Sequence, residues 1–408
     1  MTDLRTIILE LNPSGHRFHY VRLIAEGLSE VGLRPVIVTS ARAVASPEFD
    51  VHLRRVAGLA DIDASVHFPE KRGWALAGTT LQALRGALTK HRPHHAYLPF
   101  ADGVAQRLAL EGLLRRSGFL SQTRIEGLLF RGEFAYPRTR TPRDFVKDRV
   151  TEYLISRVPR TSLHLLDPLV YEHVKSISGH HRLAVTLVPE PVEMTFSMSS
   201  SESRDVLGLE RSGKYVVCVG GISRRKGTDL VLRAFQDRRI PSASALLLFG
   251  PHDEHTRSLL RGPFADAVRR GEIVSRDGYL PQSTIEHAVS AADVVALPYR
   301  RHVGSSGVLT RAAAARKTIV GQEYGWIGEC IRRFELGYTC DPESIRDLSA
   351  TLERALKKPV AQNSDARRFV AFNRPENFKA AWMTDVRRRL GLPPKQATKT
   401  WDWVLANQ

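Results

Sequence analysis

The chain has 408 residues, enough for two domains, and its 42% hydrophobic and 25% charged content excludes a disordered or fibrous protein. The chain has three cysteines that lie far apart without CxxC spacing, which argues against both a disulfide framework and a zinc site: Cys218, Cys330 and Cys340. We expect a reducing compartment, the cytoplasm. The net charge of +17 suits nucleic acid, an anionic membrane surface or phosphorylated substrates, and the lack of a nucleic-acid-binding motif disfavours the first.

The first apolar run of the chain, at residues 7–9, is too short for the core of a signal peptide. No later stretch approaches the roughly 20 apolar residues of a membrane-spanning helix. We expect a cytoplasmic protein, and leave open that it attaches peripherally to the inner face of the cell membrane.

Short β-branched runs alternate with helical patterns along most of the chain. The runs lie at residues 6–9, 36–39, 96–98 and 125–130, and then at 215–219, 245–249, 294–297 and 318–320. Between the first two runs, Tyr20, Val21, Ile24, Leu28 and Val31 recur at helical spacing before Gly32, a helix stop. The alternation predicts an α/β fold with a parallel, doubly wound sheet in each half.

The boundary between the halves is expected in the serine-rich stretch 193–203, as an interdomain linker. This predicts domains at 1–192 and 193–364, with the active site in the cleft between them. After residue 364 a basic, helical pattern with an apolar stripe predicts helices that pack back towards the first domain. Pro375 starts or kinks one of them, and the segment 365–408 ends in a tail too short to be a domain.

The strongest local pattern, at residues 216–235, is a strand, a glycine turn, three cations, another glycine and an amphipathic helix. Gly220 and Gly221 let backbone amides approach an anion, and Arg224, Arg225 and Lys226 add charge beside the next helix N-terminus. We interpret this as a diphosphate site. A plain turn with solvated cations accounts for the same residues, and the spacing of a Walker loop is absent.

A second glycine loop precedes the helical pattern at residues 308–316. Amides and hydroxyls at a helix start hold phosphate oxygens well, and two such loops in one half suggest a single ligand. Simple capping of the helix by serine is the alternative. The loop consists of Gly304, Ser305, Ser306 and Gly307.

Other polar residues carry weaker signals. Asp102 follows a predicted strand at the end where α/β proteins bind ligands, although an Asp-Gly turn explains it too. His94 and His95 precede that strand and are expected to be structural. The first half also carries a basic stretch that is either a solvated helix face or a surface for anionic lipid or glycan, at Arg138, Arg140, Arg143, Lys147, Arg149, Arg157 and Arg160.

Five stretches in one order resemble the C-terminal lobe of family 4 retaining glycosyltransferases, which have the two-lobed GT-B fold. They begin with ValProGluProValGlu at 188–193 and ArgAspValLeuGlyLeu at 204–209, and continue through the basic turn and AlaAlaAspValValAlaLeuProTyr at 291–299 to the second glycine loop. The first half resembles the family more loosely, through AsnProSerGlyHis after its first strand. The resemblance covers roughly residues 5–390.

The resemblance implies that Lys226 contacts a donor diphosphate and that residues 304–307 lie beside the phosphates and the sugar. Gly278, Tyr279 and Leu280, after Asp277, match the loop that holds the nucleobase through its backbone. Gly15, with His16 beside it, would face the acceptor. Stabilising a diphosphate leaving group needs cations and amides, so no metal and no other cofactor is required.

Three departures from the family pattern affect four positions. Val303 and Arg311 stand where the family has paired glutamates, and an arginine cannot accept hydrogen bonds from a ribose. Gly221 replaces an arginine, and Arg131 replaces a histidine expected in the first lobe. Glu323 and Glu329 are candidates to replace the missing ribose carboxylate.

We expect a glycosyltransferase of polysaccharide biosynthesis that moves a sugar from a nucleotide diphosphate to a hydroxyl of a glycan or lipid-linked glycan, with retention. Two alternatives within the fold are a catalytically inactive partner subunit and a nucleotide-sugar epimerase. A third is a membrane- or nucleic-acid-binding module that uses charge alone.

Overall fold

The computed structural model describes residues 4–13, 17–67, 73–114, 116–120, 122–130, 132–136, 141–178, 183–193, 196–237, 240–241 and 243–393. The chain forms two compact units. Unit 1 comprises residues 1–189 and 375–408, and unit 2 comprises residues 190–374. The second unit is therefore inserted in the sequence of the first.

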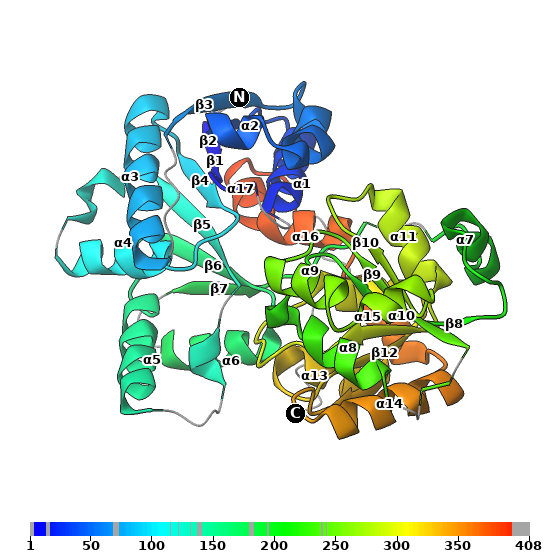
Figure 1. The fold of residues 1–408 in the computed structure, drawn as a ribbon. Helices are drawn as coiled ribbons and strands as arrows, with labels where there is room; N and C mark the ends of the chain where they lie inside the picture. Colours follow the sequence, from blue (N-terminus) through cyan, green and yellow to red (C-terminus); the bar gives the residue numbers. More distant parts are fainter. Residues whose placement is uncertain are drawn as a thin grey trace. The chain divides into compact units, whose positions relative to one another are not determined.

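Within its described residues, unit 1 forms a seven-stranded parallel sheet in the order β3-β2-β1-β4-β5-β6-β7 (Figure 1). The strands are β1 (Thr6–Leu9), β2 (Val36–Ser40), β3 (Asp61–Val66), β4 (His95–Leu98), β5 (Arg124–Leu129), β6 (Thr161–Leu165) and β7 (Ala184–Leu187). The helices are α1 (Arg17–Glu30), α2 (Ala41–Val44), α3 (Gly73–His91), α4 (Val104–Leu113), α5 (Pro142–Ile155), α6 (Pro168–Ser178), α16 (Pro375–Trp382) and α17 (Thr384–Arg389).

Unit 2 has a six-stranded parallel sheet among its described residues, in the order β10-β9-β8-β11-β12-β13. The strands are β8 (Lys214–Val219), β9 (Ser244–Phe249), β10 (Ile273–Arg276), β11 (Val294–Leu297), β12 (Thr318–Gln322) and β13 (Gly337–Cys340). The helices are α7 (Ser200–Leu207), α8 (Thr228–Phe235), α9 (Glu254–Arg261), α10 (Ala265–Arg269), α11 (Gln282–Ala291), α12 (Gly307–Ala314), α13 (Gly325–Arg333), α14 (Ile345–Lys357) and α15 (Ser364–Phe372).

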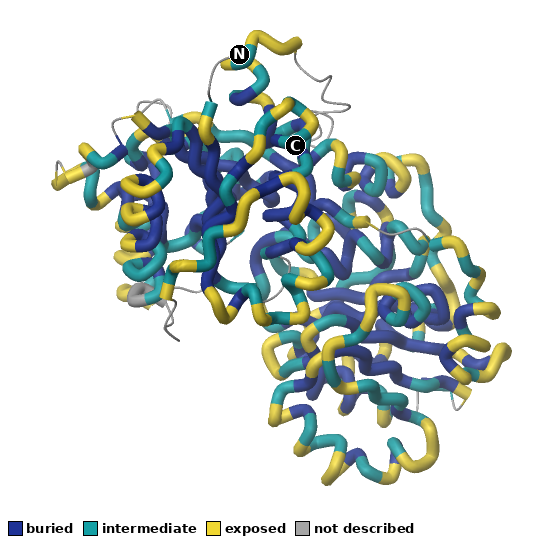
Figure 2. Tube along the Cα trace, turned by 90° about the horizontal axis from the view of Figure 1, so that it is seen from above, coloured by how far each residue is buried: buried dark blue, intermediate teal, exposed yellow. Residues whose placement is uncertain are grey.

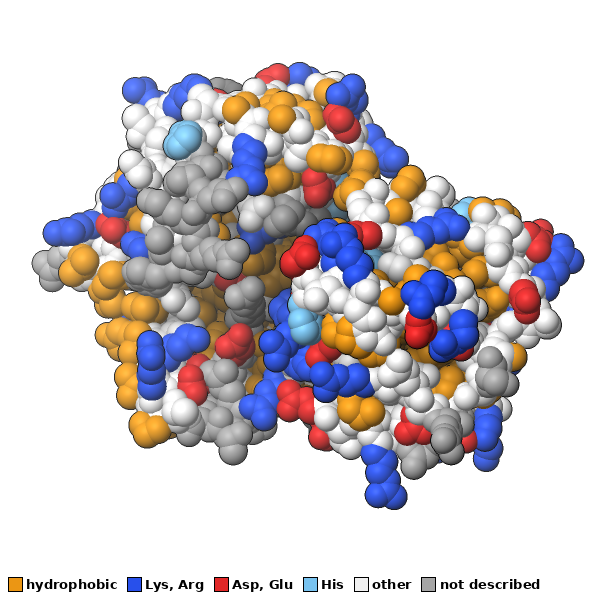
Figure 3. Space-filling view, in the orientation of Figure 1, with side chains coloured by type: hydrophobic (Ala, Val, Ile, Leu, Met, Phe, Trp, Pro, Cys, Tyr) orange, Lys and Arg blue, Asp and Glu red, His pale blue; other side chains and the backbone are white. Residues whose placement is uncertain are grey.

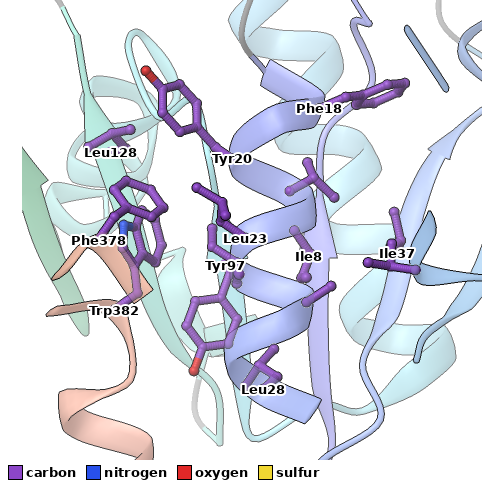
Figure 4. Packing of buried hydrophobic residues seen from close by; sticks show 14 of the residues in the cluster. Ile8, Phe18, Tyr20, Leu23, Leu28, Ile37, Tyr97, Leu128, Phe378 and Trp382 are labelled. Atoms are coloured by element: carbon purple, nitrogen blue, oxygen red, sulfur yellow. The ribbon is translucent and has the colours of Figure 1, made fainter. Parts of the chain in front are cut away.

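The core of unit 1 is completed by the C-terminal part of the chain. Figure 4 shows Phe378 and Trp382 of α16 against Leu128 and Tyr97 of the sheet, next to Tyr20 of α1. All five side chains are almost completely buried. The aliphatic strands and these rings therefore form one hydrophobic cluster, and the buried centre of each unit is visible in Figure 2.

Two details of the predicted organisation differ from the structure. The end of the serine-rich stretch 193–203 is helical, because Ser199 caps α7 and exchanges hydrogen bonds with Glu202 in a capping box. The helix α15 is part of unit 2, so the chain returns to unit 1 at Pro375 and not at residue 365. None of the helices in the described ranges is long and apolar enough to cross a membrane.

Candidate functional site

The two glycine loops of unit 2 flank the point where its strand order reverses. The chain runs outward from β8 in one direction through β9 and β10, and from β11 in the other through β12 and β13. Residues 220–227 follow β8 and residues 298–307 follow β11, at the carboxyl edge of the parallel sheet. In open α/β sheets this crevice is where ligands bind.

Close backbone packing holds the basic turn against the end of β11. Gly227 has φ +72°, and a Cβ atom there would stand 1.9 Å from the carbonyl oxygen of Pro298. The guanidinium of Arg300 donates to the carbonyl of Arg224 at 2.6 Å and to both carboxylate oxygens of Asp229 at 2.7 and 2.8 Å. The loop after β11 therefore fixes the turn that carries the three cations.

Lys226 lies where the two loops meet. Its Nζ is 3.3 Å from the position of a Cβ atom on Gly220, and Cγ2 of Val308 in α12 is 4.0 Å from the same point. The ammonium also stands 5.3 Å from the ring centroid of Tyr299, which follows β11. A side chain of this length and charge next to a helix N-terminus can reach a phosphate bound at either loop.

The side chains of Arg224 and Arg225 are exposed, and neither they nor Lys226 form a salt bridge with any described residue. Several backbone amides of the basic turn, which the sequence suggested for anion binding, already have partners within the protein. The amide of Arg224 donates to Asp253 at 2.9 Å, and those of Lys226 and Gly227 donate to carbonyls within the turn. These three amides are therefore engaged within the protein, whereas the three side chains can meet an anion.

The second glycine loop begins α12. The hydroxyl of Ser306 accepts the amide of Leu309 at 3.4 Å as the N-cap, so the capping alternative applies to this serine. The amides of Gly307 and Val308 belong to the first turn, which a helix leaves without intrahelical partners. Gly304, with φ +95°, precedes them. This helix start combines amides with the ammonium of Lys226.

A carboxylate not singled out by the sequence stands beside this loop. The hydroxyl of Ser305 donates to Glu190, which is 6% exposed, and the amide of Glu190 donates to Asn373 at 2.8 Å. The sequence feature that could have identified Glu190 is its place in ValProGluPro, as an acidic residue in an otherwise apolar stretch. Of the two proposed substitutes, Glu323 is exposed and Glu329 pairs with Arg332 at 3.2 Å.

The structure also locates the three residues of unit 2 that depart from the family pattern. Val303 is buried before the second loop and Arg311 lies half-buried in α12. Gly221 is exposed, with no atom within 4 Å of a Cβ position. The space at Gly221 is therefore open, and nearby cations come from the basic turn.

The predicted nucleobase loop follows β10 at the same edge of the sheet. A hydrogen bond from Arg257 at 2.7 Å lowers the pKa of Asp277 to about 2, and the amide of His252 donates to it at 2.8 Å. Gly278 has φ +122°, Tyr279 is half exposed and Leu280 is partly buried. The loop is thus anchored at its start, with its aromatic ring accessible.

Unit 1 has an equivalent reversal between β1 and β4. Asp102, after β4, accepts the amide of Phe130 at 3.1 Å and so ties two strand ends together, which supports its structural interpretation. Glu10, after β1, was not singled out by the sequence. Burial raises its pKa, although Arg17 pairs with it at 3.0 Å. Gly15, His16 and Arg131 lie outside the described residues.

One group among the described side chains has a spacing suited to a metal ion. His95, Glu126 and Asp385 offer ligand atoms within 4.8 Å of one another, on the sheet face covered by α16 and α17. Arg124 and Arg389 already lie 3.6 and 3.3 Å from Asp385, and this positive charge opposes a further cation. These three residues belong to unit 1, whereas the two glycine loops belong to unit 2.

Comparison with known proteins finds a family match within unit 2. Residues 213–358 match the family described as glycosyl transferases group 1. No curated protein sequence matches the chain.

Solved structures resemble the whole chain. Sucrose-phosphate synthase from Thermosynechococcus elongatus has a TM-score of 0.71 at 16% identity, covering 95% of this chain and 99% of its own. HepE from Anabaena, in complex with UDP and glucose, has a TM-score of 0.64 at 15% identity, with the same coverage. WaaG, a glycosyltransferase involved in lipopolysaccharide biosynthesis, has a TM-score of 0.63 at 13% identity and covers 94% and 99%.

At such identities the solved structures establish the fold, and the family match applies to residues 213–358. The segment that matches contains the basic turn, the nucleobase loop and the second glycine loop. The chain therefore has the GT-B fold, and its residues 213–358 match the family described as glycosyl transferases group 1.

Proposed function

We propose that the protein transfers a sugar from a nucleoside diphosphate to a hydroxyl group of a glycan or lipid-linked glycan, with retention at the anomeric carbon. The observation that carries this proposal is the position of Lys226 between the two glycine loops, at the strand-order reversal of unit 2. HepE, a protein of similar fold, was solved with UDP and with UDP-glucose. Retention rests on the resemblance to family 4 enzymes.

In this proposal Lys226 and the α12 amides hold the diphosphate. When the bond between the anomeric carbon and the phosphate oxygen breaks, negative charge accumulates on the departing diphosphate. A fixed ammonium and helix-start amides stabilise that charge more strongly in the transition state than in the ground state. Arg224 and Arg225, which are unpaired among the described residues, attract the anionic donor and steady its phosphates. The proposal requires no metal.

Glu190 is proposed to supply the carboxylate that Val303 and Arg311 do not. It is buried next to Ser305, and a sugar or ribose hydroxyl that donates to it would form a charge-assisted hydrogen bond. The acceptor is proposed to bind the loops of unit 1 after β1 and β4, where Glu10 and Asp102 lie. The cleft between the domains stays a prediction.

The first test is titration calorimetry of UDP-, GDP-, ADP- and dTDP-sugars against the wild-type protein and Lys226→Ala. We expect one nucleotide series to bind the wild type, and Lys226→Ala to weaken that binding at least about tenfold, because hydrogen bonds to charged groups contribute roughly 1.5–3 kcal/mol. Lys358→Ala is the matched control, since Lys358 is an exposed lysine of unit 2 after α14. It should bind as the wild type does.

Transfer is measured with the nucleotide that binds, as release of nucleoside diphosphate in the presence of acceptor glycans. Equal donor affinity in Lys226→Ala and the wild type would contradict the assignment of the donor site. Donor binding without transfer to any acceptor would favour an inactive partner subunit, and a change in the configuration of the free nucleotide sugar would favour an epimerase.

A further inference from the structure

The helix α5 of unit 1 exposes an apolar face. Phe145, Val146, Val150 and Tyr153 are between 49% and 60% exposed, although side chains of these types are usually buried. Val146, Val150 and Tyr153 are spaced by four and three residues, so they project from one side of the helix. The face is therefore continuous along most of α5.

Cations interleave this apolar face. Arg143, Lys147 and Arg149 are exposed on the same helix, and the guanidinium of Arg157 stands 3.9 Å from the ring centroid of Tyr153. The acidic residues Asp148 and Glu152 are buried on the opposite side. Glu152 is paired there with His173 at 3.0 Å and also receives Arg149 at 2.9 Å. The outward side of the described helix thus presents apolar and basic groups together.

The neighbouring helix α4 extends the apolar area. Leu110, Leu113 and Leu114, at and beyond its C-terminal end, are 39% to 52% exposed. The two helices pack together, and the amide of Gln106 donates to Thr151 at 3.4 Å across them. In Figure 3, orange side chains flanked by blue ones cover the part of unit 1 where Figure 1 places α4 and α5. Contiguous exposed apolar surface of this kind marks an interaction site.

We infer that the α4–α5 face, defined as these seven exposed apolar residues and the cations between them, docks on an anionic lipid bilayer. Aliphatic and aromatic side chains enter the boundary between headgroups and acyl chains, while arginine and lysine meet lipid phosphates and keep their charged ends in water. The inference goes beyond the proposed transfer reaction, since it concerns where the enzyme works. It brings the acceptor-binding unit to a lipid-linked acceptor.

Two other occupants fit the face less well. A second copy of the chain in an isologous dimer would bring the same cations against one another. Two acidic residues of α5 are buried, and the third, Asp144, is engaged with Thr141 in the capping box. A nucleic acid would be met by aromatic stacking surfaces and a basic groove, whereas most of this face is valine and leucine. Charge and aliphatic exposure together favour anionic lipid.

The experiment is co-sedimentation of the full chain with phosphatidylcholine vesicles, with and without phosphatidylglycerol, at low and high salt. Val146→Glu places a negative charge at the centre of the face and should reduce partitioning at least about tenfold. Val206→Glu is its matched control, because Val206 is a 56% exposed helical valine in unit 2. Lys147→Gln should reduce partitioning about fivefold, and Lys358→Gln should not.

The expected result is binding to phosphatidylglycerol vesicles that weakens with salt, is lost in Val146→Glu and persists in Val206→Glu. Equal binding to neutral vesicles, equal loss in both valine variants, or wild-type binding by Val146→Glu would overturn the inference. So would self-association in sedimentation equilibrium that Val146→Glu abolishes, since that result assigns the face to a second copy. Calorimetry of the nucleotide sugar on the same variants keeps the donor site separate from lipid binding.

Discussion

Glu190 and Ser305 meet although they are 115 residues apart in sequence. The carboxylate is buried, and its amide is held by the side chain of Asn373. A charge in such a place is costly unless hydrogen bonds satisfy it, and the hydroxyl of Ser305 supplies one of them.

Glu190→Gln is therefore expected to weaken nucleotide-sugar binding by on the order of tenfold, because the amide still accepts from Ser305 but carries no charge for the ligand hydroxyls. Calorimetry with the best donor measures the change. Glu329→Gln serves as the comparison, since that carboxylate pairs with Arg332 and should leave the affinity unchanged. If Glu329→Gln weakens binding and Glu190→Gln does not, the ribose carboxylate is Glu329.

Short sequence motifs predict part of the candidate donor site. The basic turn and the second glycine loop are short sequence patterns, and both lie at the sheet edge expected for a ligand. The partners of these loops come from elsewhere: Arg300 reaches back to Asp229, and Glu190 reaches Ser305. Pairings over such separations are set by the packing of strands, and no spacing rule in one sequence encodes them.

At the scale of elements, α6 begins on a buried carboxylate. Asp167 accepts the amides of Leu169 at 2.9 Å and Val170 at 3.4 Å, and the hydroxyl of Tyr136 donates to it. Burial outweighs these hydrogen bonds and raises the pKa of Asp167 from 3.8 to about 6. The cap therefore carries a group that resists ionisation in the folded chain.

The pH dependence follows from proton binding. Between pH 4 and 6 the folded chain holds more protons at Asp167 than the unfolded chain, so this residue lowers stability as pH rises through that window. Asp167→Asn keeps oxygen acceptance for the helix amides and does not ionise. The free energy of unfolding of the variant relative to wild type should thus rise by up to about 3 kcal/mol between pH 4 and pH 7.

Urea unfolding at several pH values measures this difference. Asp253→Asn is a useful comparison, since Asp253 also caps a helix, α9, but its pKa is lowered by hydrogen bonds that outweigh burial. The relative stability of that variant should change in the opposite direction, falling as pH rises through the acid range. Parallel behaviour of the two variants would contradict the assignment.

The comparison of predicted with observed strands shows which strands can be predicted from the sequence. All eight predicted runs are strands, and of the five that were not predicted, β3, β7, β10 and β13 lie at sheet edges. Edge strands bury fewer side chains, so β3 reads AspIleAspAlaSerVal without the apolar run of a central strand. The fifth, β6, is internal but carries His164, which pairs with Glu126 at 3.0 Å. A buried pair of polar side chains thus makes a strand hard to find from a hydrophobicity pattern.

At the scale of the whole molecule, each unit has its own core. Trp382 belongs to the cluster of unit 1, where its ring stacks on His164 at 4.3 Å between centroids, and Leu352 belongs to the cluster of unit 2. Both side chains are completely buried. Separate cores of this size predict separate cooperative transitions.

Calorimetric melting should accordingly resolve two transitions. Trp382→Ala removes about 3–5 kcal/mol from unit 1 and should lower one midpoint by roughly 10 °C, while Leu352→Ala should lower the other. A nucleotide sugar should raise only the transition that Leu352→Ala shifts, because the proposed donor loops belong to that unit. A single transition displaced equally by both substitutions would contradict this division.

The return of the chain at Pro375 sets an order for folding during synthesis. A ribosome adds residues at about 5–20 per second, so on the order of 10 to 40 s separate the end of β7 from the emergence of Trp382. During that interval unit 2 can complete its sheet, while the apolar face around Tyr97 and Leu128 is not yet covered by α16. We therefore expect the nascent first half to expose an apolar surface that chaperones recognise, and a chain that ends before residue 382 to leave that surface uncovered.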